Sequence, residues 1–160
     1  MGENDSGIWR DILQLQLEGV MTHIALLEKC QLNELDGFSC MHSHHAQEEF
    51  EHYLDTLENY LKTFKEVPDT QQILSPSIQL DGTTVEEKMM ACMEIYRSWE
   101  TEVLSKLQKY QVEMTEAGDE ITCLIQDVRD ELKCINLIQN DLLDEKYEEL
   151  NCWCQKKWGD

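Results

Sequence analysis

The chain has 160 residues, the size of one domain with a substantial core. Its 33 Asp and Glu residues outnumber 13 Lys and Arg, so the formal net charge is −20. This charge excludes strong binding to nucleic-acid phosphates and favours cations as partners. No apolar run approaches the length of a membrane span, and the polar, acidic start does not resemble a signal segment. We therefore expect a soluble, cytoplasmic protein without membrane contact.

Apolar residues recur at helical spacing in four long runs. Gly37 separates the first two runs, and Pro68 ends the second. Thr84 with Glu87 three residues later resembles a capping box at the start of the third run, and no signal ends the fourth before about Leu150. We expect helices at about residues 8–35, 38–66, 85–114 and 119–150.

Residues 67–84 form the one long connection, which contains Pro68 and Pro76. At about 3.3 Å per residue, such a segment can run the length of a helical bundle. The other connections are short and join antiparallel neighbours. The sequence therefore predicts an all-α, single-domain four-helix bundle in which two antiparallel hairpins are joined by one long crossover.

Carboxylates interrupt the apolar stripes of the predicted helices. Glu100 and Glu131 occupy inward positions in the third and fourth helices, and Glu18 lies beside apolar residues in the first. In the second helix, Glu49 and His52 are one turn apart on the same face. Because burying an unpaired carboxylate is costly, these side chains need partners.

The spacing of these carboxylates is the same in both hairpins. Glu18 and Glu49 are 31 residues apart, as are Glu100 and Glu131. Each hairpin can therefore bring its two carboxylates to one level of the bundle, where His52 joins them. Oxygen ligands with an imidazole suit iron or manganese better than zinc.

Other histidines and cysteines show no metal-binding spacing. By helical position, His45 lies one turn from Glu49, and we expect His42 and His44 at the surface. The seven cysteines are scattered, without the paired spacing of a zinc or redox site. We expect free, buried thiols in a reducing compartment.

Several segments resemble ferritins, especially the bacterial non-haem kind. The segment HAQEEFEH at residues 45–52 resembles their second-helix metal motif, and LQLE at residues 15–18 resembles their first-helix ligand segment. Trp99-Glu100 and the segment VRDEL at residues 128–132 resemble the ligand regions of the third and fourth helices. The likeness covers about residues 9–145 and implies a ferritin-like four-helix bundle.

The resemblance also implies a di-iron centre without haem. Carried over by position, Glu18 and His52 would bind the first iron, and Glu49 would bridge. Glu100 would bind the second iron, and Glu131 stands where ferritins usually have glutamine. The implied activity is a ferroxidase, which oxidises Fe(II) with oxygen or peroxide and stores ferric mineral in a homo-oligomeric shell of 24 subunits.

The chain departs from the ferritin pattern at several positions. Ala25 stands where ferritins usually have a tyrosine, so an electron-donating role at that position is lost. Lys133 and Cys134 replace acids of the third iron position of bacterial ferritins. The sequence of the tail after Asp144 departs most from the family, which has a Gly-containing bend and a short fifth helix there.

Two other interpretations stay open at the level of sequence. One is a ferritin-fold subunit that is structural or buffers iron without fast oxidation, because its centre is altered. The other is a metal-free acidic helical interaction module. In that case Glu18 and Glu100 lie at helix boundaries in contact with water, and the carboxylates pair with Arg97, Lys106 or Arg129.

Overall fold

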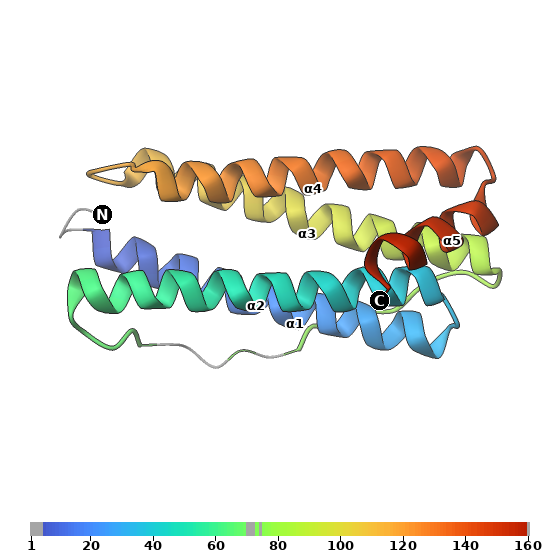
Figure 1. Cartoon of the computed structure of the whole chain (residues 1–160), viewed down its shortest axis with the longest axis horizontal. Helices are drawn as coiled ribbons and strands as arrows, with labels where there is room; N and C mark the ends of the chain where they lie inside the picture. The colour runs from blue at the N-terminus through green and yellow to red at the C-terminus, as the bar shows by residue number, and fades with distance from the viewer. Residues whose placement is uncertain (1–4, 70–72, 74, 160) are drawn as a thin grey trace.

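The computed structural model describes residues 5–69, 73 and 75–159, and this part of the chain is built from helices alone (Figure 1). Four long helices lie side by side, and a shorter one packs across one end of the bundle (Figure 1). The expected all-α bundle is therefore confirmed. Within the described residues, no helix combines the length and apolar character needed to cross a membrane. The helices are α1 (Ser6–Leu32), α2 (Asp36–Phe64), α3 (Val85–Glu113), α4 (Asp119–Leu143) and α5 (Tyr147–Trp158).

The four long helices form two antiparallel pairs, α1 with α2 and α3 with α4 (Figure 1). Helix α3 begins at the opposite end of the bundle from the end of α2, so the connection between them spans the bundle. Residues 70–72 and 74 of the predicted crossover lie outside the described residues. In the described part of this connection, Ile78 is buried and packs against the core.

The predicted capping box is present at the start of α3. Thr84 Oγ1 accepts a hydrogen bond from the backbone amide of Glu87 at 3.1 Å. The Glu87 carboxylate in turn accepts one from the backbone amide of Thr83 at 2.8 Å. These two bonds satisfy amides that a helix start leaves without partners, and they fix where α3 begins.

The prediction of one helix over residues 119–150 is wrong, because the chain reverses between α4 and α5. Glu145 adopts a left-handed backbone with φ 61°, and the amide of Lys146 donates to the carbonyl of Asp141 at 3.0 Å. The first helix ends early in the same way, with φ 59° at Glu34. Glycine usually occupies such a position, so a glutamate there gives no stop signal in the sequence.

Helix α5 docks on the first turns of α2 and buries Leu150 and Cys154. Gly37, which the sequence suggests as a break between helices, lies instead in the first turn of α2. Its amide donates to Asn151 Oδ1 at 2.6 Å. A Cβ atom at this position would lie 2.6 Å from the Asn151 carbonyl oxygen, so the contact requires glycine.

The apolar core is divided into two clusters, one toward each end of the bundle. One cluster contains Trp9, Ile12 and Ile121, and the other contains Phe38 and Ile135. Polar side chains occupy the level between them, which is where the carboxylates of the sequence analysis fall. The two clusters therefore hold the four helices in register on both sides of that level.

Replacing Gly37 by alanine is expected to loosen α5. The added methyl group clashes with the Asn151 carbonyl, and overpacking of this kind costs about 1–3 kcal/mol. Thermal unfolding should shift to lower temperature, and amide exchange in α5 should accelerate. Gly118→Ala is the matched control, because a Cβ there meets nothing within 4 Å. Equal melting curves for the two variants would show that α5 does not depend on this close approach.

Candidate metal centre

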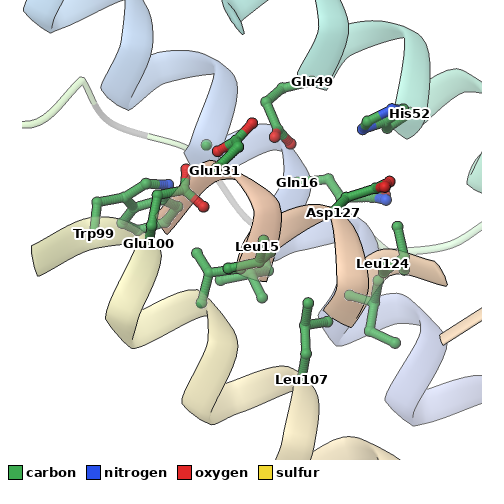
Figure 2. A pocket seen from close by; sticks show the side chains of 14 residues that line it. Leu15, Gln16, Glu49, His52, Trp99, Glu100, Leu107, Leu124, Asp127 and Glu131 are labelled. Carbon is green, nitrogen blue, oxygen red and sulfur yellow. The ribbon is translucent and has the colours of Figure 1, made fainter. Parts of the chain in front are cut away.

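A narrow cavity of about 40 Å³ lies in the middle of the bundle and is lined by all four long helices (Figure 2). A water molecule needs about 10–15 Å³ by this measure, so the cavity has room for a few water-sized bodies or ions. Its walls include apolar side chains such as Leu15, Leu107 and Leu124. The polar residues that line it are Gln16, Glu49, His52, Glu100, Asp127 and Glu131.

Four of the five sequence-predicted site residues thus meet at this cavity. Figure 2 shows the carboxylates of Glu49 and Glu131 directed toward one another, with Glu100 on one side. His52 lies on the other side, near Gln16. Glu49 and His52 come from successive turns of α2, so the i, i+3 spacing places both at the cavity.

Glu18 is the exception, because it does not line the cavity. It is half-buried, and its charge acts on Lys106 and Tyr110 of α3. The next residue, Gly19, lines the cavity in its place. Successive side chains on a helix point about 100° apart, so a side chain one position from a cavity-lining residue points away from the cavity.

His23 is the residue of α1 that approaches the carboxylates instead. It is fully buried, and its Nε2 lies 3.7 Å from Glu100 Oε1 without a hydrogen-bond partner. Ligand atoms of His23, Glu100 and Glu131 all lie within 4.8 Å of one another, which is close enough to hold one metal ion. Burial lowers the pKa of His23 to about 3, so the ring is neutral and able to coordinate a metal.

The sequence also carries a signal for His23, in the spacing of the apolar residues of α1. The buried stripe of α1 repeats every three or four residues, through Ile12, Leu15, Gly19, His23, Leu26 and Cys30. Glu18 falls outside this stripe. A polar residue on the stripe that faces the core along the whole helix is the stronger candidate for a residue of the site.

His42 is a correction to the sequence analysis, which expected it at the surface. It has no solvent exposure, whereas His44 is exposed as predicted. The His42 ring packs against Tyr96 with 5.1 Å between ring centroids, and His42 Nδ1 lies 3.1 Å from His23 Nδ1.

The carboxylates of the cavity strongly resist ionisation. Burial raises the pKa of Glu49 and of Glu100 to about 8 each. Burial and the neighbouring Glu100 raise the pKa of Glu131 well above its usual range, and Glu100 and Glu131 hydrogen bond to each other. Without a bound cation, protons must therefore neutralise much of this group near neutral pH.

Lys and Arg do not neutralise these side chains in the described part of the chain. The side chains that face them are imidazoles: His23, which is neutral, lies beside Glu100, and His45 Nδ1 lies 3.7 Å from Glu131 Oε1. Tyr96 OH also donates to Glu131 Oε2 at 3.3 Å. The basic residues that the sequence offered as partners lie elsewhere: Arg97 donates to Gln139, Lys106 pairs with Glu102, and Arg129 is exposed.

Comparison with known proteins adds no family assignment. No family model matches the chain, and no curated protein matches it significantly. The likeness to ferritins therefore remains a resemblance of short motifs. What the structure adds is a helical bundle whose middle level holds a buried histidine, the buried Glu100 and the partly buried Glu131 at metal-binding distance.

The raised pKa values predict that the metal-free protein loses stability with rising pH. In the unfolded chain these carboxyls ionise near pH 4.5, whereas in the folded chain Glu49 and Glu100 keep their protons up to about pH 8. The folded state binds more protons between these values, so the free energy of unfolding falls as pH rises from about 5 to about 8. The expected loss is on the order of a few kcal/mol.

Glu49→Gln should flatten this pH dependence, because the amide cannot ionise. Denaturant unfolding of chelator-treated protein at several pH values measures the effect. Glu51→Gln is the matched control, since Glu51 lies on the same helix but is exposed. The assignment fails if both variants keep the full pH dependence of the unmodified chain.

Proposed function

We propose that this chain is a ferritin-like iron-oxidising and iron-storing subunit. The observation that carries the proposal is the convergence of Glu49, Glu100 and Glu131 from three helices on one cavity, with no Lys or Arg pairing them in the described part of the chain. A bound cation is the partner that such a group lacks. Hard oxygen ligands with imidazole nitrogen suit Fe(II).

The arrangement offers donors for two ions rather than one. His52 and Gln16 lie on one side of Glu49, and Glu100 lies on the other (Figure 2). His23 joins Glu100 and Glu131 within 4.8 Å on that second side. Glu49 stands between the two groups, so it fits the bridging role that the ferritin resemblance gives it.

Iron is the substrate of the proposed reaction, and the chain's residues hold it and manage protons. Binding of Fe(II) displaces the protons that Glu49 and Glu100 retain near neutral pH. Each Fe(II) ion loses one electron, so a pair of ions reduces one O₂, which takes up two protons and leaves as H₂O₂. The resulting Fe(III) ions have a higher affinity for anionic carboxylates, which favours the oxidised product at this site.

The storage part of the proposal concerns assembly. The order of the helices, two pairs joined by a connection that spans the bundle, fits the ferritin-like arrangement, and α5 supplies a short fifth helix after α4. A formal charge of −20 per chain attracts Fe(II) to any shell built from copies of it. We propose a homo-oligomeric shell, with 24 subunits as in the family.

A second candidate is a subunit that binds and buffers metal ions without rapid oxidation. The placement of Glu18 favours it, because the first helix contributes a buried imidazole in place of the expected carboxylate. A nitrogen-richer donor set stabilises Fe(II) relative to Fe(III) and also accepts zinc or manganese. The oxidation rate distinguishes this candidate from the first.

Aerobic addition of Fe(II) to metal-free protein tests the proposed oxidation. The unmodified chain should produce ferric absorbance rapidly, and His52→Ala should lower the initial rate by at least about tenfold, because a ligand at the cavity is lost. His44→Ala is the matched control, since His44 is exposed on the same helix. Equal, slow traces for all three proteins would overturn the oxidation proposal, and a monomeric mass by light scattering would overturn the shell.

A second pair of variants separates the two assignments for α1. His23→Gln should lower both iron affinity and oxidation rate by at least about tenfold, whereas Glu18→Gln should leave them near the native values, because Glu18 is outside the cavity. Iron titration and initial rates measure the difference, with circular dichroism to check that both variants fold. If Glu18→Gln had the larger effect instead, the ligand from α1 would be Glu18, as the ferritin resemblance implies, and not His23.

A further inference from the structure

A second group of metal-binding side chains lies beyond the carboxylate cavity, toward the apolar cluster that contains Phe38. It consists of Cys30 of α1, His42 of α2 and Cys92 of α3, and none of the three is exposed to solvent. Their ligand atoms lie within 4.8 Å of one another. None of them lines the carboxylate cavity, so this group is separate from the centre described above.

The distances within this group match the geometry of one tetrahedral ion. Bonds of about 2.3 Å to sulfur and about 2.0–2.1 Å to nitrogen place two sulfurs about 3.8 Å apart and a sulfur and a nitrogen about 3.5 Å apart. Cys92 Sγ lies 3.5 Å from Cys30 Sγ and 3.4 Å from His42 Nε2. Small movements therefore bring all three atoms to bonding distance of one ion.

We propose that Cys30, His42 and Cys92 form a binding site for a thiophilic divalent ion, Zn²⁺ or a close analogue. A donor set of thiolate sulfur and imidazole nitrogen favours the binding of zinc over that of iron or manganese. Binding transfers the two thiol protons to solvent, and the two thiolates then balance the charge of the divalent ion. A monovalent ion such as Cu⁺ would leave a net negative charge.

The surroundings of the site favour a neutral complex. Met41, Met89 and Met93 belong to the same buried apolar cluster as the two cysteines. Because a net charge is costly in such an environment, a divalent ion with two thiolates fits better than any monovalent one. The residues come from three helices, so the ion would also tie the α1–α2 pair to α3.

The contact that His42 makes through its second ring nitrogen, Nδ1, supports its role as a ligand. Metal-bound histidines usually hydrogen bond through their second ring nitrogen, and this contact fixes the orientation of the ring. His42 Nδ1 lies 3.1 Å from His23 Nδ1. Tyr96 packs edge-on against both rings with 5.1 Å between centroids, so the direction of His42 Nε2 toward Cys92 is set by packing.

The unmodified, reduced chain with one equivalent of Zn²⁺ provides the direct test. X-ray absorption at the zinc edge should show two sulfur neighbours at about 2.3 Å and nitrogen or oxygen at about 2.0–2.1 Å. Nitrogen and oxygen neighbours alone would overturn the proposal and place the ion in the carboxylate cavity. This measurement needs no variant, so it does not depend on how a buried substitution folds.

Co²⁺ titration of variants tests which residues bind. Thiolate ligation gives an intense near-ultraviolet charge-transfer band that carboxylate and imidazole ligands do not give. Cys92→Ser should remove most of this band and weaken Co²⁺ binding at least tenfold, while Cys123→Ser, which changes an exposed cysteine, should keep it. Retention of the band in Cys92→Ser would overturn the assignment.

The variant Glu100→Gln tests the site at Cys30, His42 and Cys92 separately from the proposed iron oxidation. The variant should lose iron oxidation and retain the thiolate band, because Glu100 is a residue of the carboxylate cavity alone. Loss of the band in Glu100→Gln would mean that the two groups form one site, and it would overturn the proposal of a separate one.

Discussion

The main constraint on the structure is the burial of carboxylates that no basic side chain neutralises in the described part of the chain. Transfer of an ionised carboxylate from water to a protein interior is costly, so Glu49, Glu100 and Glu131 are compatible with the fold only as protonated groups or as ligands of cations. The two apolar clusters on either side stabilise the bundle enough to tolerate this polar level. A protein without need of a cation would gain stability from apolar residues at the same positions.

The cavity also requires both helix pairs. Glu49 and His52 belong to the α1–α2 pair, and Glu100 and Glu131 belong to the α3–α4 pair. The connection between the pairs is long, so loop geometry does not set their relative position. Packing of the apolar clusters sets it, and ligands from both pairs would reinforce it when an ion binds.

Periodicity predicted the helices and the meeting of Glu49, His52, Glu100 and Glu131 at one cavity, because both follow from the repetition of side chains on a helix face. Glu100 and Glu131 stood out as carboxylates on apolar stripes, and Thr84 with Glu87 marked the start of α3. The end of α4 could not be predicted, since Glu145 adopts a left-handed conformation that sequence associates with glycine.

Errors of rotation about a helix axis account for the remaining differences at the site. Glu18 fits one possible stripe of α1, but the stripe through His23 is the one that faces the core. The burial of His42 depends on contacts with His23 and Tyr96, which lie on other helices. Such contacts are tertiary, and a pattern within one helix carries no information about them.

The contact between His23 and His42 links the two groups of ligands through a single shared proton. Burial lowers the pKa of both rings far below neutrality, so each carries one proton. One of these two protons occupies the hydrogen bond between the Nδ1 atoms, and the other must reside on one of the two Nε2 atoms. In one tautomer His23 offers its Nε2 lone pair to Glu100 and Glu131 while His42 directs an N–H at Cys92. In the other tautomer the roles are reversed, so only one of the two Nε2 atoms has a free lone pair while the hydrogen bond between the rings is kept.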